Sequence, residues 1–438
     1  MKKNTNYILF FFAIMLTTSS CGSFSKNKKN TTKMQAAQTY KPNGKVDKFL
    51  NELLQKDSFV AAILNNPTEY HTQIIYTKID RNEKNEPAFT THSIAADPSF
   101  YYYPASTVKM PLAFLALKKI KELNAKGINI TKDMTMLTGT STAIQTAVNA
   151  DSTAPNNKPT IAHYIKKVFL VSDNDAANRL YEFLGQDYVN ANLQKMGYTS
   201  TEILHRLSVY MPKEENRITN PIKFVDATGK VVYEQPAQIN TTVYKTRKDF
   251  RGIGYMKGDS LVNEPFDFSG KNRLCLTDLD AMLRAVIFMP FVPAQNKFNI
   301  TEADRTFLLQ YMSQLPKETT YPKYDTEEYF DTYVKFNMYG SQKNASIPSN
   351  IKIFNKVGDA YGYFTDASYI IDFKNNVEFV LSITIYANKD GVFNDDKYEM
   401  ETIALPFMKR VGELIYAYEN KRTKNFVNLA EFKIQYDK

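Results

Sequence analysis

Hydrophobic residues near the start of the chain recur at helical spacing in VDKFLNELLQ (residues 46–55) and then alternate as in strands over residues 71–80 and 89–95. A polar stretch, RNEKNEP, separates the two alternating runs and has the composition of a turn. The pattern therefore predicts a helix followed by a β-hairpin.

The middle of the chain, from residue 107 to about residue 289, mostly returns to helical spacing, as in TVKMPLAFLALKKIKEL and LTDLDAMLRAVIF. An insertion at residues 221–272 interrupts it. Within the insertion, IKFVDATGKVVYEQ alternates around a Thr-Gly turn and predicts a hairpin, and the rest is irregular. The role of this insertion cannot be read from its sequence.

Three apolar runs near the C-terminal end, KIFNKVG, ASYIIDF and VEFVLSITIYA, predict strands, and a closing helix is expected from about residue 400 to 418. The expected fold is α+β, with one antiparallel sheet built from both chain ends and flanked by helices, beside a mainly helical subdomain. The expected boundaries are an α/β part at about 46–105 and 350–438, a helical subdomain at about 106–315 including the insertion, and a polar, Tyr-rich loop at 316–349.

The composition is that of a globular protein, because 43% of the 438 residues are hydrophobic and 23% are charged. The net charge of +9 is scattered and forms no basic stripe, so we expect no nucleic-acid partner. Two cysteines cannot make a disulfide framework, and the four histidines form no zinc motif. No cofactor and no metal site are expected.

The first twenty residues have the layout of an export signal: Lys2 and Lys3, an apolar run over residues 7–16, and small residues before Cys21. The stretch TTSSC resembles a bacterial lipoprotein processing site, which implies a lipid on Cys21. An ordinary secretory signal with an incidental cysteine is the alternative. Residues 21–45 are polar and are expected to form a flexible tether, so that the protein is lipid-anchored in the cell envelope and faces the periplasm.

One candidate for chemistry is an S-x-x-K motif, Ser106 and Lys109, at the start of a helix that is apolar nearly all round. The spacing puts both side chains on one helix face, and burial would lower the lysine pKa so that Lys109 could accept the Ser106 proton. The tetrapeptide alone is weak, because Ser349 and Lys352, among others, match it too.

Two further motifs follow in order. Ser172, Asp173 and Asn174 precede an amphipathic helix, where they could equally well act as a helix N-cap. Lys356, Val357 and Gly358 then form a K-x-G motif on a predicted strand, although Lys195-Met196-Gly197 also fits that pattern.

Together, in this order, the three motifs resemble those of the penicillin-recognising serine hydrolases, the class A β-lactamases and DD-peptidases, over roughly residues 46–438. The resemblance implies a β-lactamase/DD-peptidase-like fold and a small-molecule β-lactam or a peptidoglycan peptide as substrate. It implies that Ser106 is the acylated nucleophile, Lys109 its base and Ser172 a proton relay to the leaving nitrogen.

The same resemblance implies substrate-binding roles for Asn174, Lys356, Gly358 and Asp359. Asn174 would contact the substrate and the lysine, and Lys356 would be an electrostatic anchor near Ser172. The backbone N–H groups of Ser106 and of Asp359, which follows Gly358, would form the oxyanion hole.

The sequence departs from the class A pattern in two places. Aligning Leu204-His205-Arg206 without a gap puts Ser208 where a glutamate would activate the deacylating water, and a serine has no basic group for that step. Val357 replaces a hydroxyl residue that usually helps to hold the substrate carboxylate, and Asp359 places a negative charge beside it. Glu214 or Glu215 could replace the missing base only if the loop is rebuilt.

Three functions therefore remain open from the sequence. The leading one is an exported serine hydrolase of the class A β-lactamase type, with β-lactam hydrolysis that could be slow. The second is a DD-carboxypeptidase-like enzyme acting on peptidoglycan peptides, which the missing glutamate favours. The third, of another class, is a non-hydrolytic penicillin-binding or sensing lipoprotein.

Overall fold

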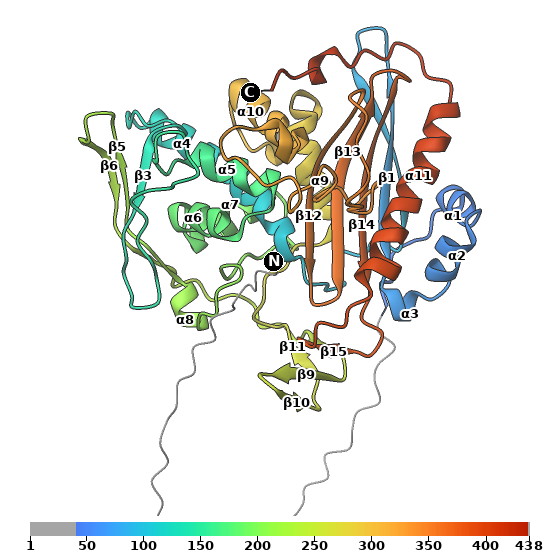
Figure 1. Ribbon diagram of the computed structural model, residues 1–438, viewed down its shortest axis with the longest axis horizontal. Helices are drawn as coiled ribbons and strands as arrows, with labels where there is room; N and C mark the ends of the chain where they lie inside the picture. The colour runs from blue at the N-terminus through green and yellow to red at the C-terminus, as the bar shows by residue number, and fades with distance from the viewer. Residues whose placement is uncertain (1–40, 437–438) are drawn as a thin grey trace, which may run out of the picture. The chain divides into compact units, whose positions relative to one another are not determined.

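A five-stranded antiparallel sheet forms the centre of residues 41–436, the part of the chain that the computed structural model describes (Figure 1). Its strand order is β12-β13-β14-β1-β2. The strands are β1 (Gln73–Arg81), β2 (Pro87–Ile94), β12 (Ile351–Ala360), β13 (Tyr363–Asp372) and β14 (Val377–Tyr386). Because residues 73–78 of β1 pair with β14, a strand near the start of the described chain and one near its end meet in one sheet, and the predicted α+β class is confirmed.

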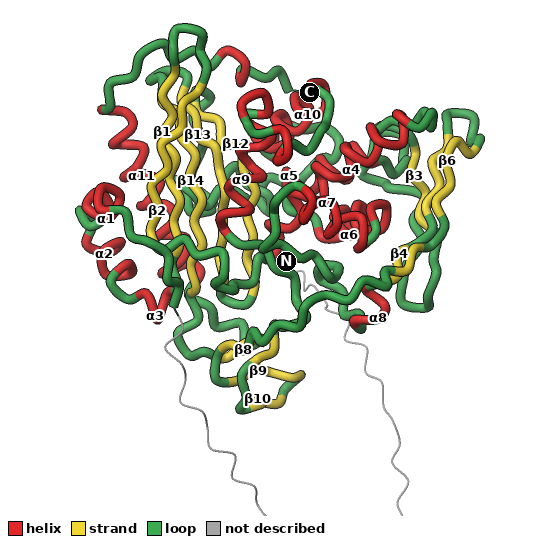
Figure 2. Tube along the Cα trace, turned by 180° about the vertical axis from the view of Figure 1, so that it is seen from behind, coloured by secondary structure: helices red, strands yellow, loops and turns green. Residues whose placement is uncertain are grey.

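Helices cover both faces of this sheet. On one face lie α1 (Lys48–Leu54), α2 (Ser58–Leu64), α3 (Pro67–Tyr70) and α11 (Leu405–Lys421), grouped on one side of the strands in Figures 1 and 2. Leu50, Ile383 and Val411 are fully buried between these helices and the strands. The other face carries α9 (Leu276–Ile287) and α10 (Glu302–Ser313), which contact β13 and β12 respectively. Since both faces are covered, β13 and β14 are buried along their whole length.

The helical middle consists of α4 (Lys109–Ala125), α5 (Ile161–Leu170), α6 (Asn174–Leu184) and α7 (Gln186–Lys195). Helices α4, α5 and α6 contact one another pairwise. Helix α4 is buried on nearly all sides, with Leu112, Phe114 and Leu115 at most 3% exposed. The all-round apolar sequence of this segment predicted such a central position.

The insertion begins with the predicted hairpin. Strands β5 (Ile222–Val225) and β6 (Val231–Gln235) pair antiparallel around a turn in which Asp226 accepts backbone hydrogen bonds from Thr228 and Lys230. Strand β3 (Thr135–Thr138) pairs with β5 and makes a three-stranded sheet. This pairing joins segments about 85 residues apart, so no local pattern could have predicted it.

The rest of the insertion, irregular in sequence, forms short elements: α8 (Lys213–Asn216), β4 (Ile218–Thr219), β7 (Gln238–Ile239), β8 (Phe250–Arg251), β9 (Gly254–Lys257), β10 (Ser260–Val262) and β11 (Phe266–Asp267). Strand β15 (Val392–Phe393), which follows the main sheet in the chain, pairs in parallel with β9. This pairing attaches the insertion to the segment that follows β14, near one end of the main sheet (Figure 1).

The closing helix begins later than expected. Residues Met400–Ala404 form a π-helical turn, and the regular helix α11 starts at Leu405. Pro406 lies in the first turn, where its missing N–H donor costs no hydrogen bond. Cys275 is the N-cap residue of α9 and is 1% exposed, and burial raises the pKa of its thiol to about 11, so little of the reactive thiolate is present at neutral pH.

Between residues 41 and 436 no helix is both long and apolar enough to cross a bilayer. The predicted signal at residues 1–20, the lipidation site Cys21 and most of the predicted tether lie outside the described residues.

Candidate active site

Ser106 lies in a 3₁₀ turn, Ala105–Val108, that leads directly into α4, whose first residue is Lys109. The Ser106 side chain is half-buried, at the point where β12 passes this turn. The residue before it, Ala105, has a φ of 47°, which is uncommon for a residue with a Cβ and is stable only where the surroundings enforce it. Strain of this kind is typical of functional turns.

Lys109 is fully buried, and its ammonium group donates to Asn174 Oδ1 at 2.7 Å and to Ser172 Oγ at 3.2 Å. It also donates to the backbone oxygen of Ser172. Burial lowers the pKa of Lys109 to about 7, although Asp173 and Asp359 act in the opposite direction. A large fraction of this amine is therefore neutral near pH 7 and able to accept a proton.

Ser172 lies between the two lysines of the predicted site. Its hydroxyl oxygen accepts a hydrogen bond from Lys356 Nζ at 2.7 Å in addition to the one from Lys109. Burial, and then the charge of Lys109, lower the pKa of Lys356 well below its usual range. The N-cap interpretation of this motif also holds, because the side chain of Asp173 accepts the backbone N–H of Ala176. One segment therefore both starts α6 and brings Ser172 to the lysines.

Gly358 allows β12 to pass against the Ser106 turn. A methyl group at this position would lie 2.6 Å from the Pro104 carbonyl oxygen and 3.0 Å from the Ser106 backbone nitrogen. Glycine is therefore required for this close approach. Val357 is buried, whereas Asp359, the next residue after Gly358, is exposed to solvent.

Ser208 also lies at this site. Asn174, which accepts a hydrogen bond from Lys109, donates through Nδ2 to Ser208 Oγ at 2.8 Å. The group beside Asn174 is therefore a hydroxyl and not a carboxylate. Glu214 and Glu215 lie further along the loop, in α8. The loop is held by a buried ion pair, Arg206 Nε to Glu182 Oε1 at 2.6 Å, with both side chains 3% exposed.

A buried polar network behind β12 was not predicted. Lys335 Nζ donates to Asn355 Oδ1 at 2.6 Å, and Asn355 Nδ2 donates to Asp366 Oδ1 at 2.9 Å. Burial lowers the pKa of Lys335 and raises that of Asp366. The network supports the strand that carries Lys356. It was not predicted because Lys335 lies in a polar, Tyr-rich segment, whose sequence gave no sign that this lysine is buried.

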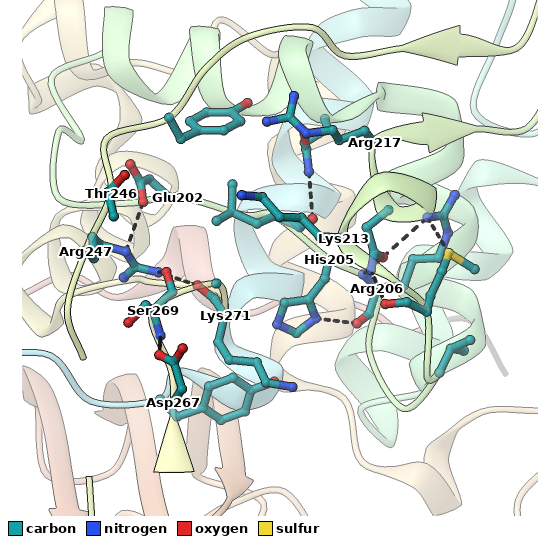
Figure 3. Close-up of a pocket in the computed structure, with 18 of the residues that line it drawn as sticks. Glu202, His205, Arg206, Lys213, Arg217, Thr246, Arg247, Asp267, Ser269 and Lys271 are labelled. Carbon is teal, nitrogen blue, oxygen red and sulfur yellow. Dashed lines mark hydrogen bonds and ion pairs between the residues drawn. The ribbon is translucent and has the colours of Figure 1, made fainter. Parts of the chain in front are cut away.

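A cavity of about 810 Å³ adjoins the site at Ser208 and was also not predicted (Figure 3). The loop over residues 202–217 and the insertion segments 243–247 and 267–271 form its walls, with Tyr103 and Tyr361 on the side of the Ser106 turn and β12. The only signal in the sequence was the set of basic residues within the insertion. No local pattern showed that they face the site.

Within residues 41–436 no group of three or more His, Cys, Asp or Glu side chains is placed to hold a metal ion. The fold and the site resemble those of a serine–lysine hydrolase, since Ser106, Lys109, Ser172, Asn174 and Lys356 lie at one place between a helical part and an antiparallel sheet.

Comparison with protein families agrees with this class. Residues 59–248 match the model described as "Beta-lactamase enzyme family", a segment that includes Ser106, Lys109, Ser172 and Asn174. Over this segment, which is less than half of the chain, the match confirms the predicted resemblance to β-lactamase-like serine hydrolases. No curated protein matches the sequence.

Solved structures with similar backbones include a β-lactamase from Sphaerobacter thermophilus, at 12% identity and a TM-score of 0.42, covering 84% of this chain and 99% of the other. PBP-A matches at 15% identity with a TM-score of 0.45, over 85% of this chain and 97% of that one. The β-lactamase from Streptomyces albus G matches at 13% identity with a TM-score of 0.42, over 83% and 98% of the two chains.

Proposed function

We propose that the protein forms an acyl-enzyme on Ser106 with β-lactams or related amides. The observation that carries this proposal is the burial of Lys109 one helical turn after Ser106, with its amine held by Asn174 and Ser172. A lysine whose pKa is about 7 can serve as a general base at neutral pH.

In the proposed acylation, neutral Lys109 takes the proton of Ser106, and the serine oxygen attacks the amide carbonyl. The N–H groups of Ser106 and Asp359 stabilise the resulting oxyanion. Protonated Lys109 then gives this proton to Ser172 as Ser172 passes its own to the leaving nitrogen, so the serine hydroxyl is restored. Lys356 supplies positive charge beside Ser172. The ester on Ser106 is the product of this half-reaction.

The fate of that ester distinguishes the leading function from the alternatives. The hydroxyl of Ser208 next to Asn174 favours slow hydrolysis, because it cannot act as a general base for water at neutral pH. The second candidate is therefore a DD-carboxypeptidase-like enzyme on peptidoglycan peptides. The third candidate is a penicillin-binding or sensing protein, which would form the same ester on Ser106 without hydrolysing it.

A fluorescent penicillin tests both steps. We expect covalent label on the wild type, a mass increase of one penicillin, and no label on Ser106→Ala. Label on the alanine variant would remove Ser106 from its proposed role. Rapid loss of label from the wild type would identify an efficient β-lactamase, and persistent label would identify a peptidase or sensor.

We further propose that the protein is exported and anchored by a lipid on Cys21, facing the periplasm, with residues 21–45 as a tether. The charged, apolar and small-residue order of residues 1–21 supports this location. The native protein should then partition into detergent, and Cys21→Ser should give a soluble or unprocessed form. Unlipidated mature protein free in the periplasm would contradict the anchor.

A further inference from the structure

The cavity beside Ser208 carries an excess of positive charge. Among its lining residues, two arginines are neutralised: Arg206 by Glu182 at 2.6 Å, and Arg247 by Glu202 at 3.4 Å. Lys213, Arg217, Lys245 and Lys271 also line it, and none of these four has a carboxylate partner within residues 41–436. Asp267 is the one acidic lining residue that no lysine or arginine of this described part pairs with. The balance of unpaired groups is therefore four cations against one anion.

Hydrogen bonds join the two insertion segments that form part of the cavity wall. Arg247 Nη2 donates to the backbone oxygens of Ser269 at 3.1 Å and Lys271 at 2.5 Å, which joins the two insertion segments. Lys271 is partly buried, with its ammonium 5.9 Å from the centre of the Tyr361 ring. Burial lowers the pKa of Lys271, so the charged form gains from a negative partner.

His205 contributes a polar atom without a partner. Its Nδ1 lies 2.6 Å from the backbone oxygen of Arg206, which places a proton on that nitrogen. The other ring nitrogen, Nε2, is then unprotonated and can only accept a hydrogen bond. It is buried and has no partner in the described part of the chain, so it could accept from an N–H group of an acyl side chain but not bind its carboxylate. In Figure 3 the His205 ring lies between the side chains of Lys213 and Lys271.

The position of the cavity indicates which part of a substrate would reach it. Lys109 donates to Ser172, the proposed proton donor to the leaving nitrogen, and also to Asn174. Asn174 in turn donates to Ser208, which lines the cavity. The leaving group would therefore lie towards Ser172, and the acyl side chain towards the cavity. A volume of about 810 Å³ is large enough for an extended acyl group.

We propose that this cationic cavity binds a carboxylate-bearing acyl side chain of the substrate, with Lys271, Lys245 and Lys213 as specificity-determining residues. This inference rests on the proposed acylation of Ser106 and names the substrate class for that reaction. A ligand carboxylate would accept hydrogen bonds from the lysines, which have no carboxylate partner within residues 41–436.

Three penicillins that differ in one charge test this inference: benzylpenicillin, carbenicillin, which adds a carboxylate to the same side chain, and ampicillin, which adds an amine. We expect the second-order rate constant for acylation to be about tenfold higher for carbenicillin than for ampicillin in low salt. Lys271→Gln and Lys245→Gln should each lower this ratio about threefold. Lys84→Gln, in the exposed β1–β2 turn, is the matched control and should not change it.

Equal rates for the three penicillins, unchanged in the lysine variants, would overturn the cavity assignment while leaving acylation of Ser106 intact. If no penicillin acylates the protein, calorimetric titration with N-acetyl-glutamyl-glutamate decides the question without chemistry at Ser106. The assignment is supported if Lys271→Gln weakens this binding at least about fivefold and if the uncharged N-acetyl-glutaminyl-glutamine amide does not bind. No binding of the acidic peptide, or binding of inorganic phosphate instead, overturns it.

Discussion

At the scale of single residues, the site depends on the burial of charge. Lys109 and Lys356 both contact the hydroxyl oxygen of Ser172, and both lose much of their hydration. Burial disfavours the charged form of both amines and lowers both pKa values, and the charge of Lys109 lowers that of Lys356 further. The chemistry assigned to Lys109 follows from this environment more than from the residue type.

The acylation rate should therefore depend on pH through Lys109. Because the base must be neutral and its pKa is about 7, the second-order rate constant should rise from pH 6 to pH 8 and then level off. Stopped-flow measurement of penicillin labelling gives this profile. Lys109→Ala should slow acylation by about 10²–10⁴-fold and remove the rising limb. An unchanged profile in that variant would assign the ionisation to another group.

Deacylation should depend on Ser208. A carboxylate at this position would lie within reach of Asn174 and the ester water, so Ser208→Glu should speed label loss by at least about 10²-fold. Ser208→Gln is the matched control without a base and should leave the rate unchanged. Glu214→Gln and Glu215→Gln should do little. Fast turnover in the wild type that collapses in either of these variants would show that α8 supplies the base.

At the scale of elements, the site exists where β12 meets the start of α4. Two segments separated by about 250 residues are held in contact because Gly358 has no side chain. The Lys335–Asn355–Asp366 network supports the same strand from behind. A buried polar network of this kind is stable only when its members are satisfied together.

Gly358→Ala should damage both stability and acylation. The added methyl group would press on Pro104 and the Ser106 backbone, and overpacking of this kind typically costs about 1–3 kcal/mol. We expect a lower denaturation midpoint and a loss of penicillin labelling larger than the loss of folded protein. Gly270→Ala, where a methyl group meets no neighbour within 4 Å, should leave the denaturation midpoint unchanged. Normal labelling of Gly358→Ala would show that β12 is not closely held against the turn.

At the scale of the whole molecule, the described residues form one compact unit, so proton uptake at one buried side chain affects the stability of the entire fold. His163 in α5 is 4% exposed, and burial lowers its pKa to about 4. Its Nε2 lies 2.8 Å from the hydroxyl of Thr153. The folded state therefore favours the neutral imidazole.

The stability contributed by His163 should be complete above pH 6.5 and should be lost as the pH falls towards 4, because only the unfolded chain takes up the proton in this range. Chemical denaturation at pH 7.5 and pH 5 should show that the free energy of unfolding of the wild type falls by about 1–3 kcal/mol more than that of His163→Gln. Equal pH dependence in both proteins would mean that the histidine is protonated in the folded state.

The main elements of the fold could be predicted from the chain alone, because their signals are local. Short windows of sequence show the apolar periodicity around α4 and in the three C-terminal strands. The order of the S-x-x-K, S-D-N and K-x-G motifs predicted the resemblance to the penicillin-recognising serine hydrolases. The N-cap role of Asp173 was equally readable, since it depends only on the next three residues.

Contacts between distant segments could not be predicted in the same way. The pairing of β3 with β5, the burial of Lys335 behind β12 and the cationic cavity at the insertion all join residues far apart in the chain. In the sequence, these charged and polar residues cannot be distinguished from residues on the protein surface, because only packing in the folded chain removes water from them. Sequence therefore determined which residues could carry out acylation, and tertiary structure decided their pKa values and what lies beside them, because desolvation and proximity exist only in the folded chain.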